Sequence, residues 1–281
     1  MTDRVLKFIQ ISDLHIVEEG ALAYDVVDTT PYLDRAVAYI NRLLPVIGPV
    51  EAVIATGDIT DHGRVAQYAR FRESVGRLDI PCYVLPGNHD SRGGMRAGFA
   101  DQGYLPPGEG PLNYRRRFGD VQLVAIDTST PGKPFGSIED ATIEWLRDTL
   151  SDLRDEPVLL ALHHPPYDTF IGHMDRQRLR EERRLLDQLS IHRGPRLMIC
   201  GHVHRFIAGQ AAEGPYVISP AVAHAVTLDH RPDGPSTFTM EPGGFLLHSY
   251  VERPGGGCFT SEYVPVGPFD GPYEFYPGRK S

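Results

Sequence analysis

Residues 5–15 read Val-Leu-Lys-Phe-Ile-Gln-Ile-Ser-Asp-Leu-His, a mostly apolar run that ends in two side chains able to bind a metal ion. The run predicts a buried strand over Val5 to Ile11. In extended backbone, Asp13 and His15 project to the same side and can grip one cation. Alone, Asp-x-His is a weak signal, because such a tripeptide is far more often a turn aspartate beside a surface histidine than a ligand pair.

The same arrangement recurs along the chain. Further strands are predicted at Ala52 to Ala55, Cys82 to Leu85, Val121 to Ile126, Val158 to Leu162 and Arg196 to Cys200. Candidate ligands directly follow these strands: Asp13 and His15, then Asp58, Asn88 with His89, His163, and His202 with His204. Open α/β folds place ligands at the carboxyl ends of their strands. We therefore expect one shared site.

Each of these residues has an ordinary structural explanation when it is met singly. Asp58 could cap the segment that follows it, and a lone histidine at a strand end is more often hydrogen-bonded than metal-bound. Five histidines at strand ends, together with two aspartates and an asparagine, are not explained that way. Mixed nitrogen and oxygen ligands without thiolate favour Mn, Fe, Co or Zn over Ca.

Helical patterns alternate with the strands, which predicts a layered α/β fold. Three helices are expected: one over Leu33 to Leu44, one after Ser137 and one over Arg178 to Leu189. Thr30 and Pro31 suit the N-cap and first helical position of the first helix. The Ser-Ile-Glu-Asp sequence from Ser137 resembles a capping box.

The character of the chain changes after Ile207. Strand-like segments at Tyr216 to Ser219, Phe245 to Val251 and Cys258 to Val264 alternate with Pro and Gly clusters. Residues 228–244 show no periodicity, which indicates a long loop or a small cap.

Composition restricts the partners and the compartment. Lys and Arg total 28 against 37 Asp and Glu, and the net charge of −9 argues against polymeric nucleic acid. Cys82, Cys200 and Cys258 form no CxxC pair, which favours a reducing compartment. No signal segment or apolar run of ~20 residues is apparent. We expect a soluble cytoplasmic protein with no membrane partner.

The motifs D-x-H, G-D, G-N-H-D, the first His of H-H-P-P, and G-H-x-H, in that order, resemble the calcineurin-like metallophosphoesterases over roughly residues 5 to 206. The strings at 12–15, 57–60, 86–90 and 163–166 look most like bacterial class III cyclic-nucleotide phosphodiesterases and their glycerophosphodiesterase relatives. The resemblance implies a single domain over residues 1–281, folded as a four-layer α/β/β/α sandwich. Residues 207–281 would complete the second sheet and supply a small cap or an oligomer interface.

The resemblance also implies two divalent or trivalent first-row metal ions. Asp13, His15 and His204 would hold one ion and Asn88, His163 and His202 the other, with Asp58 bridging both. His89 would lie close to the phosphate rather than on a metal, as a catalytic group. Asp90 could orient the His89 imidazole, or it could stabilise the turn instead.

Substrate choice rests on other loops. The family resemblance implies small phosphodiesters rather than phosphomonoesters, with 3′,5′-cyclic nucleotides first and glycerophosphodiesters second. A non-catalytic scaffold is less favoured because no ligand is missing. A protein phosphatase is less favoured because the Pro/Gly-rich segment after Ile207 favours a covered pocket. Phe170 and His173 are expected to border the pocket, where an aromatic ring could stack on a base, although core or lid packing is the plainer alternative. The segment Pro220 to His224 resembles the one that places a pocket histidine in the glycerophosphodiesterase relatives, which implies that His224 contacts a non-reacting substrate oxygen.

Overall fold

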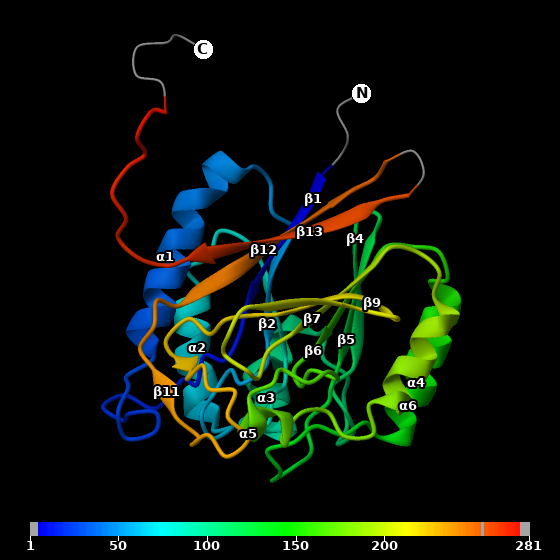
Figure 1. The fold of residues 1–281 in the computed structure, drawn as a ribbon, viewed down its shortest axis with the longest axis horizontal. Helices are drawn as coiled ribbons and strands as arrows, with labels where there is room; N and C mark the ends of the chain where they lie inside the picture. The colour runs from blue at the N-terminus through cyan, green and yellow to red at the C-terminus, as the bar shows by residue number, and fades with distance from the viewer. Residues whose placement is uncertain (1–4, 254–255, 276–281) are drawn as a thin grey trace.

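Two β-sheets form the centre of the fold (Figure 1), and the computed structural model describes residues 5–253 and 256–275. The first sheet has the order β13 (Cys258–Pro265), β12 (Gly244–Val251), β1 (Val5–Ile11), β2 (Ala52–Thr56) and β3 (Cys82–Leu85). The second has the order β4 (Tyr114–Phe118), β5 (Val121–Ile126), β6 (Val158–Leu162), β7 (Arg196–Cys200), β9 (Gly214–Ile218) and β8 (Ile207–Ala211).

Helices cover the outer faces of both sheets, with α1 (Thr30–Ile47) and α2 (Val65–Val75) on one side and α4 (Asp140–Asp152) and α6 (Arg183–Leu186) on the other (Figure 1). Shorter helical elements are α3 (Arg92–Gly98), η1 (Ala100–Gln102), α5 (Gly172–Asp175) and η2 (Asp187–Ile191). In the described residues, no helix is long and apolar enough to cross a membrane.

Strand β6 shows why the sheets stack in layers. All five of its residues are buried, and successive side chains point to opposite faces. Leu159 and Ala161 belong to the core shared with the first sheet, whereas Leu160 and Leu162 pack with Leu146 of α4. A strand that is apolar on both faces needs a cover on each side. The predicted α/β sandwich is therefore confirmed.

Parallel pairing brings the ends of the key strands together. β1, β2 and β3 run parallel in the first sheet, and β5, β6, β7 and β9 run parallel in the second. The carboxyl ends of each parallel set therefore lie at one edge of its sheet, as the sequence predicted.

The segment after residue 206 contributes to both sheets. β8 and β9 extend the second sheet, while β12 pairs antiparallel with β1 and carries β13 at the edge of the first. Within 228–244 the regular structure consists of β11 (Phe238–Thr239), which pairs with β10 (Ala225–Val226), and of Gly244, where β12 begins. Residues 1–4, 254–255 and 276–281 of the predicted domain lie outside the described part of the chain.

Three predictions about helices were wrong: the start of the first, the start of the second and the extent of the third. The first helix begins at Thr30, with Thr29 at the N-cap, one residue earlier than expected. The second begins at Asp140; Ser137 bonds Thr130 through its hydroxyl (2.7 Å) and caps nothing.

The helix predicted over Arg178 to Leu189 is reduced to α6 and η2. The amide of Leu179 donates to the carbonyl of Pro165, and that of Arg180 donates to Gly136. Glu181 also has a positive φ of 51°. Tertiary hydrogen bonds have therefore replaced helical ones in the first half of the segment.

A buried polar chain links the two sheets. Gln10 of β1 is fully buried and donates to Thr56 Oγ1 of β2 and to the carbonyl of Cys200 on β7, both at 2.8 Å. Its oxygen lies 3.0 Å from His248 Nε2 on β12, whose Nδ1 is 2.8 Å from Ser261. A buried amide that is fully satisfied in this way fixes how the two sheets meet.

Burial lowers the pKa of His248 to about 3, so this side chain is neutral in the folded protein. Because its pKa is lower in the folded state, the unfolded chain binds the extra proton, and stability falls as the pH drops from about 6.5 toward 3. Between about pH 7 and about pH 5, we expect the free energy of unfolding to fall by about 2 kcal/mol more in the wild type than in a His248→Gln variant. Urea unfolding of both proteins at each pH measures this difference. Parallel pH curves would contradict the assignment.

Candidate metal centre

The structure brings all seven predicted ligands to the carboxyl ends of five strands. Asp13 and His15 follow β1, Asp58 follows β2 and Asn88 follows β3, whereas His163 follows β6 and both His202 and His204 follow β7. All except the half-buried Asn88 are buried. The site therefore lies where the two sheets meet, and each sheet supplies part of it.

Asp58 occupies the central position among these side chains. Its Oδ2 lies 3.3 Å from His163 Nε2 and 3.6 Å from His15 Nε2. On one side, Asp13, His15, Asp58 and His204 offer ligand atoms that all lie within 4.8 Å of one another. On the other side, His163 Nε2 lies 3.2 Å from Asn88 Oδ1. One carboxylate thus borders two groups of ligands.

Local backbone strain turns these side chains inward. Five of the seven have a left-handed φ: Asp13 54°, His15 45°, Asp58 47°, His202 74° and His204 55°. The expectation of extended backbone at Asp13 and His15 was therefore wrong. Each such residue costs of order 1–3 kcal/mol and persists only where its surroundings hold it. The His15 amide donates to the Asp58 carbonyl (2.9 Å), and the His202 amide donates to the Asp13 carboxylate (2.9 Å).

Gly57 permits the close approach of the two sheets. Its φ is 94°, and a Cβ at this position would lie 2.3 Å from His163 Nδ1. A larger residue would therefore be strained and would displace a ligand.

The donor set fits metal cations. Burial, with Asp58 nearby, raises the pKa of Asp13 to about 7 despite the opposing effect of His163, because the carboxylate lacks sufficient countercharge. Burial and the neighbouring His163 lower the pKa of His202 to about 3, which leaves a neutral imidazole. Within the described part of the chain, His202 Nε2 and His204 Nδ1 are buried without a hydrogen-bond partner. Neutral imidazoles and carboxylates are the forms that ligate metals.

His89 lies beside the ligands and is held by Asp61. Its amide donates to Asp58 Oδ1 (2.9 Å), and its Nδ1 lies 3.0 Å from the Asp61 carbonyl. Burial alone would lower the pKa of His89, but Asp58 and Asp61 raise it above its ordinary value. Asp61 also accepts from His15 Nδ1 (3.1 Å). One residue thus orients both a ligand and the predicted catalytic histidine.

Asp90 has a different environment from the one that would orient His89. Its carboxylate accepts from the amides of Ile59, Thr60 and Gly87 and from the Tyr68 hydroxyl, all at 3.0–3.1 Å. These contacts tie the loop after β3 to the loop after β2. Of the two alternatives, the structure shows the turn-stabilising contacts, and the carboxylate beside His89 is Asp61.

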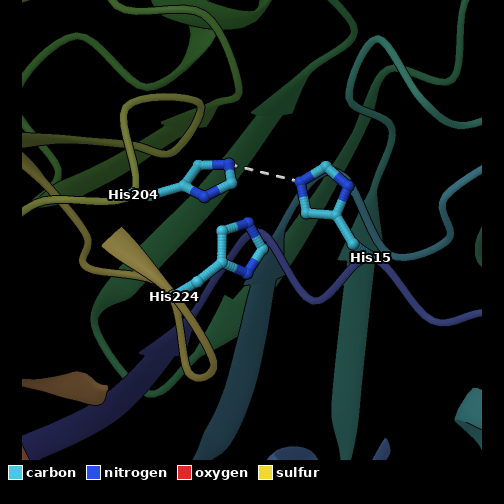
Figure 2. Close-up of side chains that lie close together, drawn as sticks. All are labelled: His15, His204 and His224. Atoms are coloured by element: carbon cyan, nitrogen blue, oxygen red, sulfur yellow. Dashed lines mark hydrogen bonds between the residues drawn. The ribbon is translucent and has the colours of Figure 1, made fainter. Parts of the chain in front are cut away.

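A cavity of about 310 Å³ opens onto the ligands. His173 and His224 line it, as expected of substrate-contacting residues, but Phe170 does not: its side chain is 72% exposed and lies beside His230. Figure 2 shows the His224 ring next to those of His15 and His204, with ring centroids 5.6 and 4.7 Å away. Neither nitrogen of His224 has a hydrogen-bond partner among the residues that the structure describes, which leaves both available to a ligand.

Several residues of the site carry no sequence signal that could have found them. Tyr24 packs against His224 and Phe238, and its hydroxyl lies 3.2 Å from His15 Nδ1. The other cavity residues not anticipated are Met174, Gln177, Val226, Ser236, Thr237 and Phe238. Asp61 could have been found, since it follows Asp58 in the same strand-end segment.

The order of the motifs along the chain and the geometry of the site both match a known protein family. Residues 6–206 match the family described as calcineurin-like phosphoesterase. The chain belongs to the calcineurin-like phosphoesterase family. The predicted family is thereby confirmed.

Similar proteins within this phosphoesterase family extend over most of the chain. A probable glycerophosphodiester phosphodiesterase of Arcobacter nitrofigilis is 36% identical over 269 residues, covering 95% of this chain and 96% of its own. A 3′,5′-cyclic adenosine monophosphate phosphodiesterase of Pseudomonas aeruginosa is 28% identical over 240 residues, with 85% and 83% covered. A dimetal phosphatase from Danio rerio shares the fold, with a TM-score of 0.63 at 16% identity over 94% of this chain and 100% of its own.

Removing the Asp61 carboxylate should weaken metal binding. We expect Asp61→Asn to lower metal affinity by roughly 10- to 100-fold, because a ligating histidine loses the group that orients it. Metal titration of the purified apo-protein measures this. Asp168→Asn is the control, since Asp168 is exposed and pairs with Arg178. Equal affinity in both variants would contradict the orienting role.

Proposed function

We propose that this protein is a binuclear-metal phosphodiesterase that hydrolyses small phosphodiesters. The observation that carries the proposal is the position of Asp58 between two groups of ligands, 3.3 Å from His163 and 3.6 Å from His15. The phosphodiesterase names of the relatives support the same reaction class.

The proposed ion assignments follow the two groups. Asp13, His15 and His204 would hold one ion, Asn88, His163 and His202 would hold the other, and Asp58 would contribute to both. Two bound first-row cations would polarise the phosphoryl group and offset the charge that develops there. Mn, Fe, Co and Zn all suit these nitrogen and oxygen donors.

His89 is the proposed catalytic residue. Its side chain is 31% exposed and lines the cavity, so it can reach a substrate bound there. Although burial alone would lower its pKa, Asp58 and Asp61 raise it, and this favours the protonated form that could give a proton to the leaving alkoxide. Asp61 fixes the ring through Nδ1 and leaves Nε2 available for this transfer.

The first substrate candidate is a 3′,5′-cyclic nucleotide. Tyr24 and Phe238 line the cavity with their rings 5.4 Å apart and offer flat apolar surface to a base. The second candidate is a glycerophosphodiester, favoured by the 36% identical relative from Arcobacter nitrofigilis. A cavity of about 310 Å³ suits either small molecule better than a protein substrate.

The proposal extends to organisation and location. We propose a single domain over residues 1–281, a homo-oligomer contact through the C-terminal segment, and a cytoplasmic location. The free thiols of Cys82, Cys200 and Cys258 support a reducing compartment.

A substrate panel tests the reaction class. We expect Mn-loaded enzyme to hydrolyse cyclic AMP, glycerophosphocholine or bis(p-nitrophenyl) phosphate at least about tenfold more efficiently than p-nitrophenyl phosphate, a difference of about 1.4 kcal/mol in barrier. Steady-state kcat/KM on all four compounds measures this preference. A preference for the monoester would overturn the diesterase class.

Two substitutions separate chemistry from metal binding. His89→Ala should retain both metals and lose roughly 10²- to 10⁴-fold in kcat, the range for a lost general acid. Asp58→Ala should lose metal and activity together. Metal analysis alongside kinetics distinguishes the two, and metal loss in His89→Ala would place His89 among the ligands.

A further inference from the structure

A second cavity adjoins the metal centre on the other side of Tyr24. Its volume is about 570 Å³, and it shares Tyr24, Asn88 and His89 with the cavity that holds His224. An acyclic phosphodiester carries two separate substituents on its phosphorus. With phosphorus bound beside Asn88 and His89, each cavity can receive one substituent.

The wall of the larger cavity contains the side chain of Lys133, a cation that could bind a substrate. Lys133 is exposed and makes no ion pair with any residue that the structure describes. The chain has only three lysines, at 7, 133 and 280. Of the acids in the same wall, Asp61 is already engaged by His15 and His62 (3.1 and 3.3 Å), and only Asp25 carries a further negative charge.

The loop around Lys133 is held in place. The backbone amide of Lys133 donates to the Thr130 carbonyl (2.9 Å), and this hydrogen bond closes a turn in which Gly132 has a φ of 71°. The Thr130 and Ser137 hydroxyls bond across the base of the loop at 2.7 Å. Thr128 Oγ1 lies 2.8 Å from His164 Nδ1, beside the ligand His163. The turn that carries Lys133 is thus anchored to the metal-ligand segment.

We propose that the larger cavity is a subsite for a diester substituent that carries an ionised carboxylate, and that Lys133 is its specificity-determining residue. This inference rests on the proposed function and names the substrate class. The Lys133 ammonium and a single carboxylate on the substrate carry complementary charges. Because Lys133 lies in the same cavity wall as His89, it can affect the binding of the substrate. Asp25 in the same wall disfavours a substituent with a second phosphate, since that would bring a larger negative charge beside it.

Two substrates that differ by one carboxylate provide the test: sn-glycero-3-phosphoserine and sn-glycero-3-phosphoethanolamine. The readout is the ratio of their kcat/KM values on metal-loaded enzyme, because a ratio is insensitive to incomplete folding or loading. Lys133→Met should lower the serine-to-ethanolamine ratio about fivefold, the effect of one partly exposed ion pair. Lys133→Arg, which keeps the charge, should restore most of the ratio.

Lys7→Met is the matched control, because Lys7 lies in β1, donates to the Ile47 carbonyl and lines neither cavity. Its ratio should equal that of the wild type. A Lys133→Met ratio that also equals the wild type overturns the subsite.

If the wild type hydrolyses no diester at all, the proposed function fails, but the subsite can still be tested. Calorimetric titration of the metal-loaded protein with phosphoserine and phosphoethanolamine then decides. A preference for phosphoserine that Lys133→Met abolishes supports the subsite, whereas equal affinities for the two compounds overturn it.

Discussion

Asp58 Oδ2 lies 3.3 Å from an imidazole of the second sheet and 3.6 Å from one of the first. Every other feature of the site depends on keeping this carboxylate at that junction. The Asp58 carbonyl accepts the amides of Leu14 and His15, which fixes the neighbouring strand end. Its other oxygen accepts the amide of His89. A single residue therefore contacts proposed ligands from both sheets and the proposed catalytic histidine.

The gathering of the seven proposed ligands could be predicted in part from simple geometry. Strands that are apolar on both faces can be recognised in the sequence, and parallel strands bring their carboxyl ends to one edge of a sheet. This geometry places the residues of each sheet near one another, whereas the meeting of the two sheets was implied by the family resemblance.

Predictions failed where long-range contacts decide local structure. The pattern after Arg178 is helical, but the carbonyls of Gly136 and Pro165 capture the amides of its first residues. Phe170 follows the metal strand closely in sequence, yet it points to solvent. Tyr24 and Phe238 are separated by more than two hundred residues and meet only because the fold closes over the cavity. Neither periodicity nor spacing carries information about such contacts.

The β10–β11 hairpin contacts the segment after the proposed ligand His204 and also lines the cavity at the metal centre. Arg205, directly after the ligand His204, donates to the Val226 carbonyl (2.7 Å) and forms a two-pronged ion pair with Glu241 (2.9 and 3.0 Å). The hairpin places Phe238 against His224. Partly exposed ion pairs are individually weak. The two parallel hydrogen bonds between Arg205 and Glu241 therefore contribute mainly by fixing the orientation of the two side chains.

The left-handed backbone at five ligands has an evolutionary consequence. Glycine adopts such a conformation at no steric cost, whereas aspartate and histidine are strained in it even though they adopt it more often than most residues. A ligand replaced by glycine would therefore end catalysis and at the same time relieve strain. Selection for activity works against stability at these positions, and a descendant released from catalysis could lose its metals while its fold became easier to maintain.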